Sequence, residues 1–481
     1  MTEHPTTLII GAGPAGLTAA LLAARSGRST TVLEAGTEVG GISRTEVHHG
    51  YRYDIGGHRF YTKSEAVSKL WHEVMGADFL RVKRLSRIFF GGRFYSYPLR
   101  IFETLNNLGP AESFAIAASY LRWKLSPHPA EETFEHWVTN RFGRRLFRTF
   151  FKTYTEKVWG IPCTEIRADW AAQRIKGLSL RSAVTNAIFR RGNVKSLIEA
   201  FDYPRLGPGM MWEKFTNAIR AAGGHVHLQR KVTSLHHHHG RVTAVSVSHP
   251  DGRMELLHPD NVISSMPLRS LVRQLDPPPP PEVVAAAEAL KYRDFILVGL
   301  VVDRPGIFPD NWIYVHSPAV AVGRIQNFGN WSAAMLPDPE SSSSLGMEYF
   351  CSVGDPLWNL TDDELVDLAT REFATLNLAP GARVRHGVVI RQPKAYPVYD
   401  ADYLKHVTTI RSWLAGLENF ESIGRNGQHR YNNQDHSMLT GMFAAQNLQQ
   451  PGELTDLWDV NVERSYYEEV VVPKKPAAGA A

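Results

Sequence analysis

Cysteine is scarce in this chain, because the 481 residues contain only Cys163 and Cys351. The two lie far apart and match neither a zinc-binding nor a CxxC spacing, which is typical of a protein from a reducing compartment. The run His236–His239 could suggest a metal, but neighbouring side chains on a strand point to opposite faces. We therefore expect a solvated hairpin end at these histidines, and no metal site in the protein.

Long apolar runs are missing as well. No run of roughly 18 apolar residues occurs, and the first residues lack the charged and apolar regions of a signal peptide. We expect a soluble, cytoplasmic protein without a transmembrane segment. The net charge of +5 does not indicate nucleic-acid binding, although a pI near 9.0 leaves room for a phosphate-bearing ligand.

The length and the order of patterns predict several domains. A single hydrophobic core stops growing well below 481 residues. The segment TLIIGAGPAGLTAALLAARSG combines a short strand, a glycine turn and an Ala/Leu helix, and the strand TTVLEA follows. Between about residues 100 and 200 the pattern is helical and rich in aromatic residues.

The second half of the chain alternates between strand and helix signals. We expect a helix at Met211–Ala222 and then two paired strands around a turn at Gly240. The proline-rich segment Asp276–Glu282 marks a boundary before the strands of an antiparallel sheet. A last helix is predicted at Met438–Leu448, and the end VVPKKPAAGAA is predicted to be disordered.

A dinucleotide fingerprint opens the chain. Gly11, Gly13 and Gly16 form GxGxxG directly after the first strand, where glycines permit a tight turn, close approach to a pyrophosphate and close helix packing. The helix N-terminus then faces the phosphates. Glu34 ends the second strand, where a carboxylate can accept both ribose hydroxyls. This much leaves NAD and FAD undecided.

The continuation EVGGISRT favours FAD. Its residues Gly40, Gly41, Ser43 and Arg44 resemble the second glycine pair of the two-dinucleotide-domain flavoproteins. The strand around Val232, the segment VISSMPL and the segment RYNNQDHSMLTGMFAAQNL also resemble segments of that superfamily, in the same order. The resemblance implies an adenine contact near Val232 and a flavin contact near the last segment.

That last segment contains Asp435, His436 and Ser437, which we expect at the flavin. Asp435 or Ser437 can cap a helix that begins near Met438. A helix N-terminus beneath the flavin would stabilise the negative charge of its reduced form.

Two motifs narrow the resemblance from the superfamily to one family. DIGGHRF, from Asp54 to Phe60, and YTEKVWG, from Tyr154 to Gly160, are similar to segments of UDP-galactopyranose mutases. That family implies contraction of a hexopyranose to a hexofuranose on a nucleotide diphosphate, through a bond between N5 of reduced FAD and the sugar, with no net redox change. Reduced FAD would be required, and NADPH is a possible reductant. Gly57 and His58 would then lie at the flavin.

The family implies a substrate site as well. Two arginines clamp the diphosphate, for which Arg174 and Arg324 are the candidates, and together with His58 they form our predicted catalytic set. Arg425 matches a family arginine near the flavin. The substrate-binding residues would be Phe150, Tyr154, Trp159, Arg174, Arg324, Tyr396 and Tyr431.

Each assignment has a plainer alternative. The aromatic residues could be core packing, both clamp arginines could be surface residues, His58 could be a core histidine, and Tyr399 could take the place of Tyr396. Tyr, Glu, Lys and Trp together are poorly suited to a dry core, because each polar tip needs a partner. The chain also departs from the family in DYPRLGPGMMWEKF, in a long segment 175–210 and in GRNGQHRYNN.

The predicted fold is α/β: a Rossmann-like FAD-binding domain with a helical subdomain and an antiparallel β-sheet substrate domain. The predicted ranges are 1–100, 201–275 and 411–460 for FAD binding, 101–200 for the helices, 276–410 for the sheet and 461–481 for a tail. The predicted function is a flavin-dependent nucleotide-sugar mutase in the biosynthesis of a surface polysaccharide or a glycosylated metabolite. A flavin oxidoreductase and a non-catalytic flavin-binding partner are the alternatives. The oligomeric state is left open.

Overall fold

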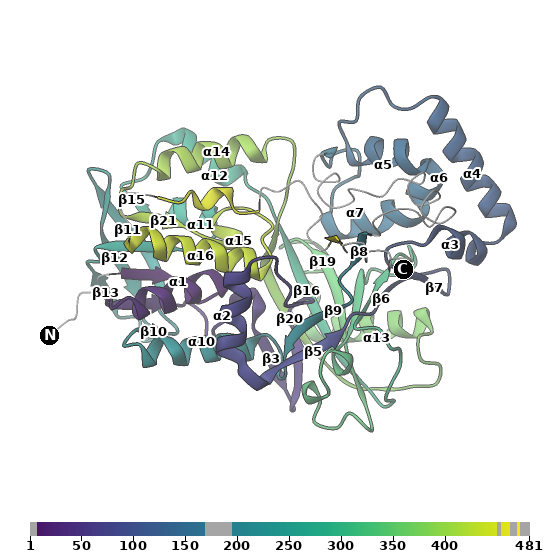
Figure 1. The fold of residues 1–481 in the computed structure, drawn as a ribbon, viewed down its shortest axis with the longest axis horizontal. Coiled ribbons are helices and arrows are strands. Elements are labelled where there is room, and N and C mark those ends of the chain that lie inside the picture. The colour runs from purple at the N-terminus through teal and green to yellow at the C-terminus, as the bar shows by residue number, and fades with distance from the viewer. Residues whose placement is uncertain (1–6, 169–194, 450–453, 462–468, 472–481) are drawn as a thin grey trace, which may run out of the picture.

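The computed structural model describes residues 7–168, 195–449, 454–461 and 469–471. Figure 1 shows two halves side by side, with a group of helices beside the second half. The chain passes between the halves several times, so that segments far apart in sequence lie together in each of them. In the described part, no helix is both long and apolar enough to cross a membrane.

The first half is built on a parallel sheet of five strands in the order β10-β2-β1-β14-β21. These strands are β1 (Thr7–Ile10), β2 (Thr30–Leu33), β10 (His225–His227), β14 (Asn261–Ser264) and β21 (Phe420–Ser422). Both faces are buried, as expected for a parallel sheet. Ile9 faces a core shared with three helices: α1 (Pro14–Arg25), α10 (Gly209–Ala221) and α16 (Gln434–Gln449).

The opposite face of this sheet is covered by a second layer. Leu8 and Ile10 face a core formed with a four-stranded sheet and three helices. The strands are β11 (Lys231–His238), β12 (Arg241–Ser248), β13 (Met254–Leu257) and β15 (Leu275–Asp276), and the helices are α11 (Leu268–Arg273), α12 (Pro281–Ala289) and α14 (Tyr403–Leu414). The hairpin turn at Gly240, with φ of 73°, is as predicted.

The second half is a seven-stranded sheet in the order β20-β16-β19-β18-β17-β6-β7. Its strands are β6 (Ser86–Phe90), β7 (Arg93–Ser96), β16 (Tyr292–Val302), β17 (Trp312–Val315), β18 (Arg324–Asn327), β19 (Ser343–Cys351) and β20 (Val384–Pro397). One face packs on α13 (Asp362–Leu376), and the other contributes Phe295, Leu297 and Val301 to the core of the first half. The sheet is therefore joined to the dinucleotide-binding half by a shared core.

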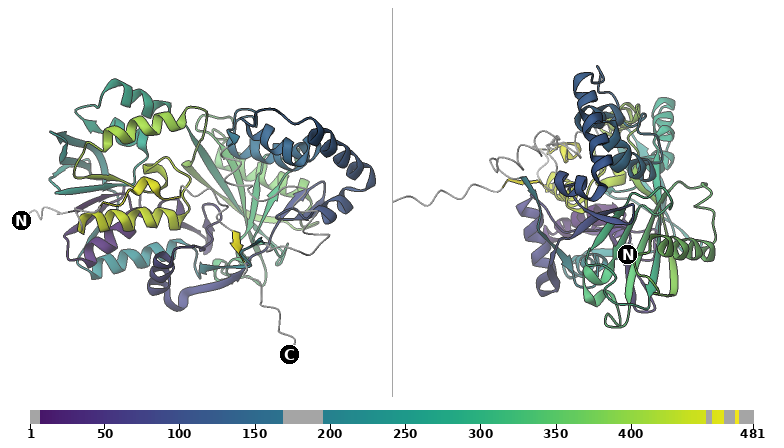
Figure 2. Two further views of the ribbon diagram at one scale, coloured as in Figure 1. Left: turned by 45° about the horizontal axis from the view of Figure 1, so that its top comes forward. Right: turned by 90° about the vertical axis from the view of Figure 1, so that its right-hand side faces the viewer.

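The helical subdomain stands on β6 and β7. It consists of α3 (Ile101–Leu108), α4 (Pro110–Leu125), α5 (Phe134–Phe142), α6 (Arg144–Leu146), a π-helical turn (Phe147–Lys152) and α7 (Thr153–Trp159). Its aromatic core includes Ile88 and Tyr95 from the sheet. Figure 2 shows this subdomain projecting from the rest of the molecule.

The sequence-based boundaries need three corrections. The substrate sheet takes β6 and β7 from the range 1–100, and its pairing of β17 with β6 is parallel. The range expected to be helical, 101–200, ends in strands, because β8 (Lys195–Leu197) precedes β9 (Ala200–Pro204), which pairs with β5 (Phe79–Lys83). Short strands completed by distant partners leave little local signal.

The C-terminal end also differs from expectation. Helix α16 begins at Gln434, four residues before the predicted Met438. Within the range expected to be a tail, the short strand β22 (Glu469–Val471) pairs with β8. The residues from Val472 onward lie outside the described part of the chain.

Candidate flavin and substrate site

The glycine fingerprint forms a tight turn between β1 and α1. Gly11 has φ of 99°, which only glycine adopts readily, and a Cβ on Gly16 would lie 1.9 Å from the carbonyl oxygen of Gly11. These two glycines therefore allow helix and turn to meet. A Cβ on Gly13 would instead meet nothing within 4 Å. Gly13 faces open space at the N-terminus of α1, as a pyrophosphate contact requires.

The second glycine pair lies against the first. Gly40 and Gly41 have φ of 102° and 56°, and a Cβ on Gly41 would lie 3.4 Å from Cα of Gly13. The amide of Gly40 donates to the carbonyl of Ala12 at 2.8 Å. A backbone hydrogen bond therefore holds the two glycine turns together. The space beside these turns suits the phosphates of FAD.

Glu34 lies at the end of β2 beside the same turn. Its carboxylate accepts from the amides of Ala12 and Gly36, each at 2.8 Å. The amide of Arg230 donates to the carbonyl of Glu34 at 2.8 Å, which brings the start of β11, with Val232, to this edge. The predicted ribose and adenine contacts therefore lie together.

Ser43 and Arg44 link the glycine turns to other parts of the protein. The hydroxyl of Ser43 donates to Oε1 of Gln434 on α16 at 3.0 Å. Arg44 donates to Oε1 of Gln392 on β20 at 2.8 Å and forms an ion pair with Glu46. Ser43 thus ties the glycine turn to α16 within the first half, and Arg44 ties it to β20 of the second half.

The N-terminus of α16 lies at the cavity described below. Because the helix begins at Gln434, Asp435, His436 and Ser437 lie in its first turn, and the prediction that Asp435 or Ser437 occupies the cap position is wrong. All three are buried, and the amide of Ser437 donates to the carbonyl of Asn433 at 3.0 Å. The positive end of the helix dipole therefore points towards the cavity, where it favours negative charge.

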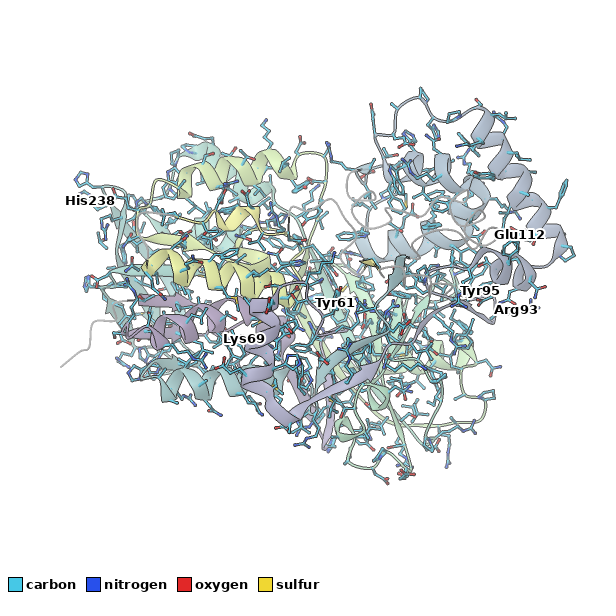
Figure 3. The ribbon with its side chains drawn as sticks, viewed as in Figure 1. Tyr61, Lys69, Arg93, Tyr95, Glu112 and His238 are labelled. Carbon is cyan, nitrogen blue, oxygen red and sulfur yellow. The ribbon has the colours of Figure 1, made fainter. Side chains whose placement is uncertain are left out.

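A cavity of about 100 Å³ lies between the two halves. It is lined by residues from the glycine-histidine motif, β18, β20 and the segment before α16: Ile42, Ile55, Gly56, Gly57, His58, Arg59, Tyr61, Ile198, Arg324, Tyr396, Arg425, Tyr431, Asn433 and Gln434. Figure 3 shows Tyr61 where the two halves meet. Three of these described lining residues are arginines and none is acidic, so the cavity favours an anionic ligand.

His58 lines this cavity. Its Nε2 donates to the carbonyl of Ile55 at 2.9 Å. Burial lowers the pKa of His58 to about 4, and the nearby Arg425 and Arg324 act in the same direction. The imidazole is therefore neutral at neutral pH.

Arg324 reaches the cavity from β18 and is held from behind by a buried carboxylate. Its Nε donates to Oε2 of Glu348 on β19, and Gln326 donates to the other oxygen of Glu348 at 2.7 Å. Burial opposes the charge on Arg324, but Glu348 and the surrounding tyrosines raise its pKa well above the ordinary value. The Nη2 atom is 3.8 Å from a Cβ built on Gly56, a cavity residue.

Two tyrosines and Arg425 form a stack on another wall. The rings of Tyr396 and Tyr431 lie 5.6 Å apart and nearly parallel, and the guanidinium of Arg425 lies over both. Arg425 donates to the carbonyls of Asn432 and Ala395, so its position is fixed. Burial raises the pKa of Tyr396 to about 12, and its phenol stays protonated. Tyr399 lies behind this stack, and its phenol oxygen accepts from the backbone amide of Tyr431.

The motif YTEKVWG divides into two sets of residues. Tyr154 stacks on His316 at 4.9 Å, and burial raises its pKa well above the ordinary value. Trp159 is buried, with its ring 6.5 Å from that of Tyr431. These two aromatic residues lie behind residues of the cavity wall, Tyr154 near Arg324 and Trp159 near Tyr431.

The polar residues of the motif have structural partners instead. Glu156 accepts from the amide of Cys163 at 3.1 Å. Lys157 donates to the carbonyls of Ser317 and Val322 at 2.7 and 3.2 Å, and burial lowers its pKa to about 8. They fasten α7 to the chain that follows it and to the β17–β18 loop.

Of the predicted substrate residues, Arg324, Tyr396 and Tyr431 line the cavity, whereas Phe150, Tyr154 and Trp159 are not among its lining residues. Phe150 is 3% exposed and packs on Tyr95, with ring centroids 5.1 Å apart, in the helical core. It shares a neighbour with Tyr154, since both rings lie near His316. Arg174 lies outside the described residues.

Sequence reasoning missed several residues of the site. Arg59 and Tyr61 line the cavity one and three positions after His58, and Glu348 supports Arg324. The acid in the apolar run MEYFCSV was a signal for Glu348, because an acid in a buried strand needs a partner. His236–His239 form a hairpin end, and among the described residues no group could hold a metal ion.

Comparisons with known proteins agree with this architecture. A family model described as flavin containing amine oxidoreductase matches residues 14–400. The chain belongs to this family. It is an FAD-dependent enzyme of the amine oxidase superfamily, and the glycine turns and Glu34 described above fit FAD.

Several solved structures share the fold of this flavoenzyme. The crystal structure of reduced UDP-galactopyranose mutase has a TM-score of 0.82 at 21% identity, over 95% of this chain and 96% of that one. Putrescine oxidase bound to putrescine has a TM-score of 0.61 at 16% identity, over 92% and 99%. An oxidoreductase from Methanosarcina mazei has a TM-score of 0.61 at 14% identity, over 91% and 99%. The predicted resemblance and fold class are thus confirmed at the level of fold.

Proposed function

We propose that this flavoenzyme is a nucleotide-sugar mutase that interconverts the pyranose and furanose rings of a sugar attached to a nucleotide diphosphate. The observation that carries the proposal is the charge of the cavity, whose described lining contains Arg59, Arg324 and Arg425 and no acid. Guanidinium groups bind diphosphates through paired donors. The product would serve the biosynthesis of a surface polysaccharide or a glycosylated metabolite.

The same charge argues against a cationic substrate. A diamine such as putrescine carries positive charge, and the described lining offers it no acidic side chain, while the nearby Glu348 is already paired with Arg324. A substrate with two phosphates is instead attracted both by the arginines and by the N-terminus of α16. The cavity therefore favours an anionic substrate whatever the reaction is.

Each cavity residue has a role in this proposal. Glu348 holds Arg324 so that its Nη groups face the ligand, and the phenols of Tyr396 and Tyr431 donate hydrogen bonds to phosphate oxygens. Trp159 walls the sugar. Arg174 remains our proposal for the second half of the clamp.

On the flavin side of the cavity, the residues would position the flavin and stabilise the charge of its reduced form. When bound, reduced FAD would supply a nucleophilic nitrogen for the anomeric carbon of the sugar. Neutral His58 would then lie beside the flavin without adding positive charge, and the N-terminus of α16 would stabilise the negative charge of the reduced form.

A product assay tests the proposal. The holoenzyme, reduced by dithionite or NADPH, is incubated with a panel of nucleotide sugars, and ring contraction is followed by chromatography and NMR. We expect a furanose product with no reductant consumed per turnover. Absence of ring-contracted product from every nucleotide sugar that binds would contradict the mutase.

Arginine variants test the clamp separately. Arg324→Lys keeps a charge opposite Glu348 but removes the planar fork, so nucleotide-diphosphate affinity should fall by roughly tenfold while FAD stays bound. Arg174→Lys should lower the nucleotide-diphosphate affinity in the same way. The matched control is Arg141→Lys, because Arg141 pairs with Glu131 on the outside of the helical subdomain. Unchanged affinity in both clamp variants would refute the clamp.

A net oxidoreductase is the second candidate, and membership of the flavin containing amine oxidoreductase family favours it. It would oxidise an anionic small molecule. The same assay distinguishes the two, because an oxidoreductase consumes an electron acceptor in proportion to its product. A non-catalytic flavin-binding partner would bind FAD and convert no ligand.

A further inference from the structure

Helix α4 exposes an apolar stripe on the outer side of the helical subdomain. Phe114, Leu121 and Leu125 are 77%, 60% and 85% exposed. Leu121 and Leu125 follow Phe114 by seven and eleven residues, so each lies within about 20° of Phe114 around the helix and the two leucines are about 40° apart. Ala117 and Ala118, both exposed, lie between them on the same side. The stripe therefore runs along most of α4.

The other side of α4 is the one that packs on the subdomain. Ile116 is buried there in the aromatic core, and the backbone at Tyr120 lies against Gly143. Figures 1 and 2 place α4 at the outer edge of the molecule, with its far side turned away from the other described elements. Single exposed apolar residues are ordinary on a protein surface, but an aligned series on one helix face indicates a binding surface.

Basic residues flank the stripe on both sides. Arg122 and Lys124, both exposed, lie about 80° to either side of the line through Phe114 and Leu121. The one acid of α4, Glu112, lies about 160° away and pairs with Arg145 on α6 at 2.7 Å. An apolar face bordered by cations, with its acid turned away and neutralised, can contact the acyl chains and the anionic headgroups of a membrane interface together.

The charges also decide between a membrane and a second copy of the chain. Two copies that met through this face would bring Arg122 and Lys124 of both chains together, without the acid of either α4 facing them. An anionic lipid surface instead attracts the cations while the acyl region receives Phe114, Leu121 and Leu125. We propose that α4 docks this enzyme on the surface of an anionic lipid bilayer.

Vesicle binding tests this surface. The FAD-loaded full-length protein is sedimented with vesicles of phosphatidylcholine and phosphatidylglycerol, and with vesicles of phosphatidylcholine alone. We expect binding to the anionic vesicles that weakens as salt is added. Arg122→Gln with Lys124→Gln, and separately Leu121→Ser with Leu125→Ser, should each lower the partition coefficient by roughly tenfold or more.

The matched control is Met254→Ser with Leu256→Ser. These exposed residues of β13 are 56% and 53% exposed, so the change removes similar apolar surface elsewhere. The control should bind vesicles like the unchanged protein, and melting temperatures confirm that every variant folds. Lack of binding to anionic vesicles, or equal losses in the control, would overturn the proposal. So would a lipid-free dimer, seen by analytical ultracentrifugation, that the Leu121→Ser and Leu125→Ser changes dissociate.

Discussion

The glycine turns of the first half and the cavity wall of the second half are built in opposite ways. At Gly11 and Gly16 the structure depends on absent side chains, since a Cβ on Gly16 would lie 1.9 Å from the carbonyl oxygen of Gly11 and Gly11 has φ of 99°. On the cavity wall it depends on buried polar side chains that pair across strands, as Arg324 does with Glu348. The first arrangement is local and tolerates no added atom at Gly16, whereas the second is assembled over distance and tolerates no lost partner.

Removing Glu348 should have the largest effect. Glu348→Ala leaves Arg324 as a buried charge without its counter-ion, which typically costs about 3–5 kcal/mol. Glu348→Gln keeps an acceptor for Arg324 and should cost less. Urea unfolding of the FAD-loaded protein measures both variants. If Glu348→Ala unfolds with the same free energy as the unchanged protein, the ion pair does not support the cavity wall.

Adding one carbon to the glycine turn should separate folding from cofactor binding. Gly16→Ala places Cβ 1.9 Å from the carbonyl of Gly11, and such overpacking costs about 1–3 kcal/mol or more. Gly13→Ala meets no protein atom within 4 Å, so the fold should be kept while FAD affinity falls. Thermal unfolding of the apoprotein measures the stability of each variant, and titration with FAD measures its cofactor affinity. A Gly13→Ala variant with unchanged FAD affinity would show that the open space is not the phosphate site.

The pH dependence of stability should reveal a buried acid beside the flavin motif. Burial raises the pKa of Asp54 to about 7, although Tyr203 and Thr45 donate to it. Between about pH 4 and 7 the unfolded chain has lost a proton that the folded protein keeps, so Asp54 lowers stability as pH rises through this window, by up to about 1.4 kcal/mol per pH unit. Asp54→Asn should remove this slope. Denaturant unfolding across this pH range compares Asp54→Asn with the unchanged protein. If the free energy of unfolding changes with pH equally in both, the raised pKa of Asp54 is contradicted.

The smallest effect is expected in the YTEKVWG motif. Lys157→Met removes the donor to the carbonyls of Ser317 and Val322 and should cost about 1–2 kcal/mol. FAD affinity should be unchanged, because this residue fastens α7 rather than contacting the flavin. Lys152→Met, an exposed position one turn earlier, is the control and should lie within about 0.5 kcal/mol of the unchanged protein. Equal stability of the two variants would refute the structural role of Lys157.

The same contrast explains how much could be predicted from the sequence. The glycine turn could be predicted, because GxGxxG, Glu34 and the second glycine pair lie within one short stretch, and Gly11 and Gly16 have steric reasons to be glycine. Tyr396 and Tyr431, which we predicted for one site, do lie together, with ring centroids 5.6 Å apart. That prediction came from the family resemblance and not from any local pattern.

The failures have physical causes as well. The roles of Glu156 and Lys157 depend on partners in other segments, and nothing near them in sequence indicates those partners. The strands β6, β8 and β9 are short and need distant neighbours, so local propensity could not assign them to their sheets. The start of α16 was misplaced because Gln434 and Asp435 continue a polar run that resembles a loop.

The packing of α16 on α1 sets the order in which the protein can be completed during synthesis. A Cβ on Gly441 would lie 2.3 Å from the carbonyl of Ala15, and Arg28 donates to the carbonyl of Leu448, 420 positions later. The apolar side of α1 therefore stays exposed to solvent until almost the entire polypeptide has left the ribosome. Nascent chains should depend on chaperones until then, and C-terminal truncations that remove α16 should aggregate rather than yield a smaller flavoprotein.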